Sequence, residues 1–324
     1  MSGPGSEPEQ ESAEQEREQQ RSRELIEAGG IPLNAERRLK ELRGTPGQDG
    51  ATNGSFTSDL SVSDFALCHR LGLKPVSQVM GSSIYQVGYQ SSTWPMMMGG
   101  SVLTELDTLS QAWNEVRRRA LTRLGLEARL AGADAVVGVQ LRTAAHDWAE
   151  GAIEYAVLGT AVHRDGATAR ASSPASSPEG EGEGGQPVLT ELTVADYAKL
   201  LAADVEPLGI VAWTSVFFAS MEGAWLLEPS RLNPTYNYEL REFTEGVYGA
   251  REQVMERLGA QAQTLGASGI VGVRIGHSVR LQQVGSANRS RGGAVITFDA
   301  IGTAVREGTA TSVQPPKTTI DLST

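Results

Sequence analysis

The sequence predicts an α+β protein with two tandem copies of a small domain, each a long helix packed on an antiparallel sheet. The first observation is a repeated segment, A-G-A-D-A-V-V-G-V at residues 131–139 and L-G-A-S-G-I-V-G-V at residues 265–273. The second is the stretch before each copy, whose apolar residues recur with helical spacing. The third is a shared Gly-Thr-Ala-Val ending, at residues 159–162 and 302–305, which closes a strand-like apolar stretch.

We expect the two domains to span residues 59–163 and 189–306, each close to the usual size of a folded domain. Residues 164–188 between them are rich in Ser, Pro, Gly and Glu, which predicts a flexible acidic linker. Residues 307–324 are predicted to form a disordered C-terminal tail.

Residues 1–58 predict a disordered acidic tail, because their start is mostly Glu, Gln, Ser, Gly and Arg and at most a transient helix is expected there. A short amphipathic motif at residues 25–43 interrupts this tail. Asn34 can cap a helix on which Leu39 and Leu42 share one face. Such a helix is too short to persist alone. It either packs on the first domain or folds onto a protein partner through these leucines.

A short capped helix is expected to open each domain. The motifs are Ser-x-x-Asp at residues 61–64 and Thr-x-x-Asp at residues 193–196, 132 residues apart. Each is a capping box, in which the hydroxyl accepts a hydrogen bond from the backbone amide three residues later and the carboxylate reaches back. The helices, about ten residues long, should end before Pro75 and Pro207.

Two extended pieces follow each capped helix, within residues 76–87 and 208–219. They are rich in β-branched and aromatic residues, which predicts strands. Hydroxyl pairs recur within them, Ser82-Ser83 and Thr214-Ser215. No base for catalysis can be assigned to these hydroxyls from the sequence, so we expect them to form hydrogen bonds at a strand edge.

The loops after these strands are more apolar than solvated loops should be. We therefore expect oligomer or partner contacts there. The residues concerned are Trp94, Met96, Met97 and Met98 in the first domain and Trp225, Leu226 and Leu227 in the second. The three methionines could also attract a soft ion such as Cu(I), although consecutive methionines more often fill an irregular apolar contact.

The long helices are predicted over residues 105–131 and 239–265, each with one apolar stripe. The opposite face of the first carries four arginines. These arginines are Arg117, Arg118, Arg119 and Arg123. The run at residues 117–119 could bind an anion, but a solvated face or salt bridges at a subunit contact is the more common role.

A glycine should end each long helix, and a strand should follow it. Gly132 and Gly266 stand where a left-handed residue commonly closes a helix. Residues 135–141 and 269–275 then form apolar runs, which predict strands buried on both faces.

Composition excludes several classes of protein. The net charge of -11 and the pI of about 5.0 argue against general binding of nucleic acids, which requires clustered Lys and Arg. Cys68 is the single cysteine, so an intramolecular disulfide or a multi-cysteine zinc cluster is excluded. No apolar run approaches the roughly 20 residues that span a bilayer, and the N-terminus lacks the pattern of a signal peptide, so we expect a cytoplasmic protein.

Metal ligands and enzyme motifs are sparse. Neighbouring residues of a helix point about 100° apart, so Cys68 and His69 cannot easily chelate one ion. His146, Asp147 and Glu150 are weak candidates for a metal site in a turn, where a hairpin also favours such residues. No Walker loop, G-x-G-x-x-G after a strand, H-E-x-x-H or G-x-S-x-G motif occurs, so neither an enzyme nor a cofactor is expected.

These motifs resemble the YbjQ-like family, which is named for heavy-metal binding. The resemblance rests on the long helices with Arg123-Leu124 and Arg257-Leu258, the segments after Gly132 and Gly266, and the two Gly-Thr-Ala-Val endings. It implies a YbjQ-like or dodecin-like α+β domain that assembles into pentameric rings, and a metal ion is implied by the family name alone.

The sequence thus predicts a non-enzymatic structural or interaction protein that forms a homo-oligomeric, ring-like assembly. The alternative is a module that binds a heavy metal or a small ligand.

Overall fold

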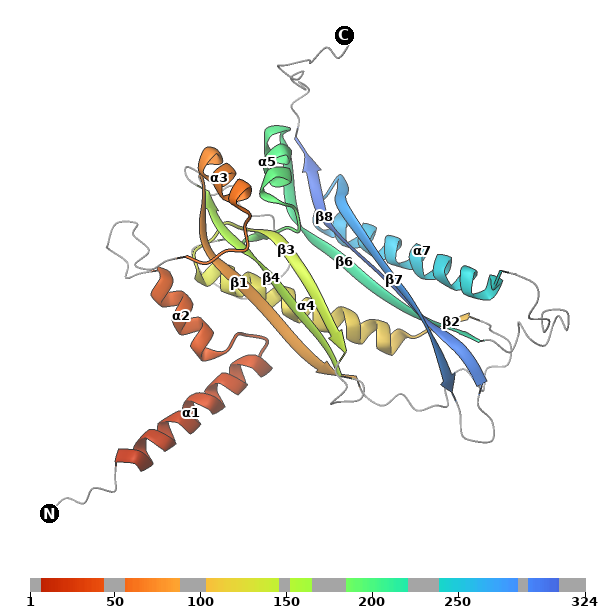
Figure 1. The fold of residues 1–324 in the computed structure, drawn as a ribbon, viewed down its shortest axis with the longest axis horizontal. Helices are drawn as coiled ribbons and strands as arrows, with labels where there is room; N and C mark the ends of the chain where they lie inside the picture. Colours follow the sequence, from red (N-terminus) through yellow and green to blue (C-terminus); the bar gives the residue numbers. More distant parts are fainter. Residues whose placement is uncertain are drawn as a thin grey trace, which may run out of the picture.

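Two mixed α+β repeats lie side by side in the computed structural model, each with a long helix on one face of a sheet (Figure 1). The structure describes residues 7–43, 56–87, 103–145, 152–164, 185–220, 239–284 and 291–308. We call residues 56–164 the first repeat and residues 185–308 the second. The helices are α1 (Glu7–Glu27), α2 (Leu33–Arg43), α3 (Val62–Leu71), α4 (Asp107–Leu130), α5 (Val194–Ala202) and α7 (Arg241–Thr264). The strands are β1 (Leu73–Gln86), β2 (Leu103–Glu105), β3 (Ala135–Ala145), β4 (Ala152–Arg164), β5 (Val188–Leu189), β6 (Val205–Ser220), β7 (Gly269–Val284) and β8 (Arg291–Glu307).

Each sheet contains three antiparallel strands of one repeat and a short strand from elsewhere. The strand orders are β1-β4-β3-β5 and β2-β6-β8-β7. β2 belongs to the first repeat but pairs with β6 of the second, and β5, which leads into the second repeat, pairs with β3 of the first. The β3–β5 pairing is parallel, so the first sheet is mixed and not purely antiparallel as the sequence predicted.

The apolar stripes of the two long helices form the two main cores, as predicted. In α4 the stripe includes Val116, Ala120 and Leu124, and in α7 it includes Val254 and Leu258, all fully buried. These side chains remove apolar surface from water on one face of each sheet, which is the main stabilising term for such a layer.

The predicted helix ends are present. The Ser61 hydroxyl accepts from the Asp64 amide at 3.1 Å and donates to the Asp64 carboxylate at 2.7 Å. The carboxylate of this capping box therefore reaches the hydroxyl of the first residue. At the ends of α4 and α7, Gly132 and Gly266 have φ values of 78° and 69°, the left-handed geometry predicted for both.

The strand after each capped helix is continuous, where the sequence predicted two pieces. β1 runs through Gly81 and β6 runs through the equivalent Trp213. A Cβ at position 81 would overlap the backbone carbonyl oxygen of Ala120 in α4. Gly81 therefore allows β1 and α4 to approach closely, and it does not break the strand.

The N-terminal region contains two helices. α1 covers residues for which the sequence predicted disorder or a transient helix, and it projects away from the repeats (Figure 1). Its Glu, Gln and Arg residues are strong helix formers. α2 packs on α4, where Leu39 is fully buried with Ile31 and Ala131, and Leu42 lies against the same cluster. The motif at residues 25–43 is thus packed on the first repeat.

Arg123 of α4 forms hydrogen bonds with both the N-terminal region and the first sheet. Its guanidinium donates to the carbonyl oxygens of Ile26, Gly30 and Ser82 at 2.6–3.0 Å. Arg123 is 9% exposed, so the prediction of a solvated arginine face is wrong at this position.

A carboxylate and an amide occupy equivalent positions of α4 and α7, and each bonds the backbone at a strand edge. Glu127 accepts from the Met80 amide at 2.9 Å. Gln261 accepts from the Ala212 amide at 3.0 Å and also donates to the Ala212 carbonyl at 3.2 Å. Burial raises the pKa of Glu127, while the bond from Met80 and the charge of Arg38 oppose that rise.

Replacing Glu127 by Gln is expected to raise the free energy of unfolding by about 1 kcal/mol at pH 7, because the amide needs no charge desolvation and adds a donor for the Met80 carbonyl. A carboxyl group whose pKa is raised in the folded state makes the protein less stable as the pH rises above the ordinary pKa of 4.5. The difference in free energy of unfolding between wild type and Glu127→Gln should therefore become smaller toward acid pH. Urea unfolding across pH 4 to 8 measures this, and a Glu127→Gln variant less stable than the wild type at pH 7 contradicts it.

Within the described ranges, no helix is long and apolar enough to cross a membrane.

Candidate functional site

The contact between the two repeats begins where α4 lies along the outer edge of β6. The Leu106 amide donates to the Val216 carbonyl at 2.7 Å, and the Val216 amide donates to the Ser110 hydroxyl at 2.9 Å. One turn further, Asn114 accepts from the Thr214 amide at 3.0 Å and donates to the Thr214 carbonyl at 2.8 Å. Polar side chains of a helix from the first repeat thus satisfy the edge of a strand in the second, as an additional strand would.

β2 continues this contact toward the N-terminus of α4. Its residues 103–105 pair antiparallel with residues 217–219 of β6. The Leu103 side chain packs into the core of the second repeat, close to Gly246 and Gly249 of α7. The first repeat therefore contributes both a strand and a core side chain to its neighbour.

Arg117 is the charged centre of this contact. It is 4% exposed and donates to the Thr214 hydroxyl at 2.8 Å and to the Asn114 side chain, and its guanidinium lies 5.8 Å from the centre of the Tyr155 ring. Desolvation lowers the pKa of Arg117, while the charge of Asp299 favours the protonated guanidinium. The sequence prediction of a solvated or anion-binding side chain is therefore wrong for Arg117, which has partners in both repeats.

Arg118 and Arg119 lie nearer the surface than Arg117. Arg118 and Arg119 both bond Glu115, at 2.8 Å and 2.7 Å, along the exposed side of α4. These hydrogen bonds lower the pKa of Glu115 to about 2, the bond from Arg118 contributing most. Arg118 and Arg119 thus belong to a solvated helix face, which is one of the two roles that the sequence favoured, and their salt bridges lie within α4.

A second part of the contact is the segment at residues 188–192. We call it leader 2, because it precedes the capped helix of the second repeat. Its backbone forms four hydrogen bonds of 2.8–3.0 Å with β3 of the first repeat. They join Val188 N to Asp134 O, Thr190 N to Val136 O, Val139 N to Thr190 O, and Gly138 N to Leu192 O. The Thr190 hydroxyl meets the Thr303 hydroxyl of the second repeat at 3.0 Å. Leader 2 therefore ties both repeats together.

Leader 2 covers the edge of β3. No described segment pairs in the same way with the equivalent strand β7. In β3, Val136, Val137 and Val139 are at most 1% exposed. Their counterparts in β7 are half-buried, and Ile275 is 52% exposed. The prediction of strands buried on both faces is thus confirmed for residues 135–139, which leader 2 covers. It is wrong for residues 140–141 and 269–275, where Gln140 and Ile275 are exposed.

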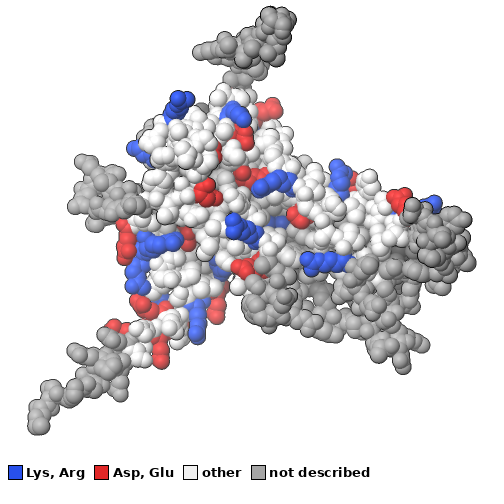
Figure 2. Space-filling view, viewed as in Figure 1, with Lys and Arg blue, Asp and Glu red and all other residues white. Residues whose placement is uncertain are grey.

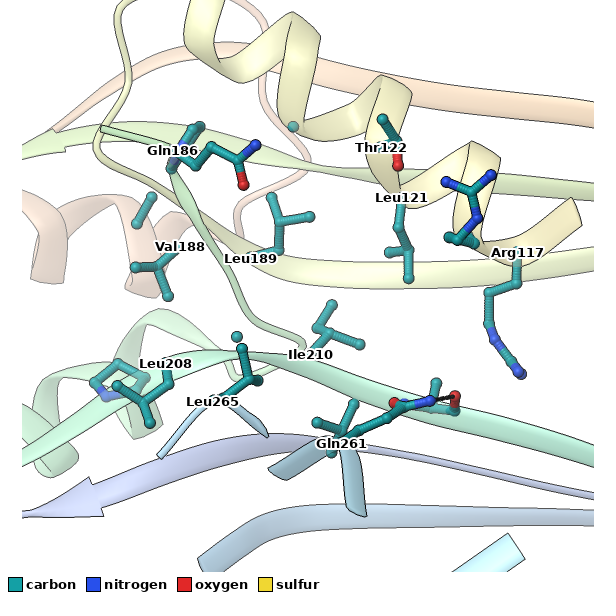
Figure 3. A pocket seen from close by; sticks show the side chains of 18 of the residues that line it. Arg117, Leu121, Thr122, Gln186, Val188, Leu189, Leu208, Ile210, Gln261 and Leu265 are labelled. Atoms are coloured by element: carbon teal, nitrogen blue, oxygen red, sulfur yellow. Dashed lines mark hydrogen bonds between the residues drawn. The ribbon is translucent and has the colours of Figure 1, made fainter. Parts of the chain in front are cut away.

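A groove with a volume of about 2050 Å³ also lies between the repeats (Figure 3). Its walls come from α4, leader 2, β6 and the end of α7. Apolar side chains form one part of its wall, and polar and charged ones, among them Arg117, Gln186 and Gln261, form a comparable part. Small-ligand sites combine apolar walls with a few placed polar groups. The apolar side chains include Leu121, Val188, Leu189, Leu208, Ile210 and Leu265.

The histidines and the cysteine among the described residues do not gather at one site. Cys68 is fully buried, which raises the pKa of its thiol, whereas His69 is exposed and stacks edge-on with Phe65. His277 is exposed on β7. In the part of the chain that the structure describes, no three His, Cys, Asp or Glu residues are placed to hold a metal ion.

Several predicted contact or ligand residues lie outside the described ranges. They are Trp94, Met96, Met97, Met98, His146, Asp147, Glu150, Trp225, Leu226 and Leu227.

Charges are mixed on the surface. Basic and acidic side chains are interspersed over the described residues of the face shown in Figure 2. A polyanion is bound by clustered Lys and Arg, so this face does not have the charge pattern of a general nucleic-acid surface.

Comparison with known proteins places this fold in a family. A family model described as "Putative heavy-metal-binding" matches residues 77–165 and 232–307. A protein of Mycobacterium tuberculosis (strain ATCC 25618 / H37Rv), described as an encapsulin nanocompartment protein, is 33% identical over 267 residues, which cover 81% of this chain and 90% of the relative. No solved structure matched the chain. The chain therefore belongs to the YbjQ family and carries two tandem copies of its domain.

Proposed function

We propose that this chain is a non-enzymatic structural protein that associates head to tail with copies of itself into a closed, ring-like assembly. The observation that carries the proposal is the contact between the repeats. In this contact a helix of the first repeat meets a strand edge of the second repeat. The second repeat has an equivalent helix and the first repeat an equivalent strand edge, and among the described residues neither makes such a contact within the chain.

The first unused surface lies at the outer edge of β1, equivalent to the covered edge of β6. Glu127 and Arg123 of the same repeat already bond the Met80 amide and the Ser82 carbonyl there, so the apolar side chains along this edge are what is left for another chain. In β6, Ala212 is 8% exposed and Val216 is fully buried, with its backbone bonded to Leu106 and Ser110. The equivalent residues of β1, 132 positions earlier, are Met80 and Ile84, which are 48% and 56% exposed. Large apolar side chains in a row at a strand edge are typical of a contact surface.

The second unused surface is the N-terminal half of α7, equivalent to the part of α4 that covers β6. Asn114 and Arg117 of α4 bond the second repeat. Their counterparts in α7, 134 positions later, are Tyr248, which is 63% exposed, and Arg251, which is 45% exposed at its side chain. Tyrosine and arginine are enriched at protein interfaces.

Docking the α7 surface of one chain on the β1 edge of the next repeats the internal contact between chains. A contact between unlike surfaces generates a ring when the rotation closes and a filament when it does not. The relative described as an encapsulin nanocompartment protein supports an assembly-forming role for this chain.

The test is the mass of the protein in solution, measured by light scattering at micromolar concentration. We expect a mass well above the 34.4 kDa of one chain. The variant Ile84→Glu places a charge on the β1 edge and should shift the protein toward single chains.

Ala13→Glu is the matched control, because Ala13 is exposed on α1, which projects away from the repeats (Figure 1). It should keep the wild-type mass. A wild-type mass of one chain, or equal masses for wild type and Ile84→Glu, contradicts the proposal.

The groove supports a second candidate function, the binding of a small, largely apolar ligand between the repeats. Purified protein would then carry a bound organic molecule that native mass spectrometry detects and denaturation releases. The variant Ile210→Arg places a charge in the apolar wall and should abolish that added mass, whereas absence of added mass in the wild type counts against this function.

A further inference from the structure

We infer that residues 56–60 of one chain add as a parallel strand to the β7 edge of another chain. The inference rests on the assembly proposed above and identifies a second part of its interface. We call residues 56–60 leader 1, because they stand 132 positions before leader 2 and precede the first repeat as leader 2 precedes the second. The two read F-T-S-D-L and V-L-T-E-L, with a hydroxyl, an acid and a leucine at the same places.

Each leader is held by its own repeat in the same way. In leader 2, Glu191 accepts from Arg274 of β7 at 2.7 Å. In leader 1, Asp59 accepts at 3.4 Å from Gln140, the residue of β3 equivalent to Arg274.

An equivalent threonine of each repeat also bonds its leader. The Thr160 hydroxyl donates to the Asp59 carboxylate at 2.7 Å, and the equivalent Thr303 hydroxyl meets the Thr190 hydroxyl at 3.0 Å. Leader 1 therefore lies against the same two strands of its repeat as leader 2, although the bonded side chains differ.

The leaders differ in what their backbones meet. Leader 2 pairs with β3 of the preceding repeat. Leader 1 has no such partner strand among the described residues. Its Thr57 carbonyl accepts one hydrogen bond from the Gln78 amide of β1 at 2.5 Å, but none of the described strands pairs with it. Phe56, the counterpart of Val188, is 41% exposed and stacks on Phe65.

The edge of β7 has the shape that β3 offers to leader 2. Gly138 in β3 has a φ of 64° and donates its amide to the Leu192 carbonyl. The equivalent Gly272 in β7 has a φ of 66°, and both strands shift register at this glycine, between Val137 and Gln140 and between Val271 and Arg274. A strand that fits β3 through this bulge thus meets the same backbone on β7.

The occupant of the β7 edge is a second copy of the chain. β7 and β2 are the two edge strands of the second sheet. The first repeat of the same chain joins this sheet at β2, so it does not cover the β7 edge. Leader 1 is fastened to its own first repeat through Asp59. A leader 1 in the same relation to β7 as leader 2 to β3 must therefore come from another chain, and this direction agrees with docking of α7 on the β1 edge.

Cysteine pairs test this pairing. Ala135 and Val188 are directly paired in the β3–β5 contact, and their equivalents are Gly269 and Phe56. Gly269 accepts a side chain, because a Cβ at this position would lie 4.0 Å from its nearest neighbour, a methyl group of Val305. The full-length variant Phe56→Cys/Gly269→Cys is made together with Cys68→Ala and oxidised mildly, and the matched control is Ala135→Cys/Val188→Cys in the same background.

We expect the Phe56/Gly269 variant to form disulfide-linked multimers on non-reducing gels, while the control forms a disulfide within one chain. The inference is overturned if the control is oxidised and light scattering gives an oligomer, but the Phe56/Gly269 variant stays uncrosslinked or closes within one chain. A single-chain mass by light scattering instead overturns the proposed function itself, so the two failures are distinct.

Discussion

Replacing Arg117 by Ala is expected to lower the free energy of unfolding by about 3–5 kcal/mol, because the guanidinium is almost fully buried between the repeats and its removal leaves polar partners without a donor. The Thr214 hydroxyl would lose its bond from Arg117. Asp299, whose pKa is raised by burial, would lose the positive charge that opposes this rise. Urea unfolding at a fixed protein concentration measures the loss.

The matched control is Arg251→Ala, at the equivalent position of α7. Arg251 is 45% exposed at its side chain, so its removal should change the free energy of unfolding of one chain by no more than about 0.5 kcal/mol. It should nevertheless weaken association, since Arg251 lies on the surface proposed to meet the next chain. Equal destabilisation by the two variants would contradict the distinction between a used and an unused surface.

Replacing Gly81 by Ala is expected to destabilise the first repeat by about 3 kcal/mol, because the added methyl group overlaps backbone atoms of α4 and forces helix and strand apart. The nearest atoms are the Ala120 carbonyl oxygen and the Leu124 amide nitrogen, neither of which can rotate away. Thermal unfolding followed by circular dichroism measures the effect.

The control for this substitution is Gly259→Ala in α7. A Cβ at Gly259 has no atom within 4 Å, and alanine favours a helix over glycine by about 0.5–1 kcal/mol. Gly259→Ala should therefore leave the melting temperature unchanged or raise it. A Gly81→Ala variant as stable as Gly259→Ala would show that β1 and α4 are not packed this closely.

The elements of the fold follow from local patterns in the sequence. The hydroxyl and acid at positions 61 and 64 predict a helix start, and Gly132 predicts a helix end, because each geometry depends on a few neighbouring residues. The apolar stripe of α4 predicts its buried face for the same reason. The helix α1 was not expected, because its polar sequence offers no apolar face to pack.

The contact between the repeats could not be predicted from these patterns. Ser110 and Asn114 look like ordinary polar residues on a helix, and only the position of β6 beside them makes them ligands of a strand edge. The apolar runs at residues 135–139 and 269–273 are alike in sequence. Leader 2 covers the first run, whereas the second has no such cover among the described residues and is half-buried. The one sequence signal for the leaders was the shared pattern of a hydroxyl, an acid and a leucine before each capped helix.

The most direct measurement is native mass spectrometry of the full-length wild-type protein. The account predicts one dominant species whose mass is an integer multiple, greater than one, of the 34.4 kDa chain, because a ring of fixed size closes every free surface. A spectrum dominated by the single chain at micromolar concentration would contradict it, since the exposed β1 edge and α7 surface would then have no second copy to cover them.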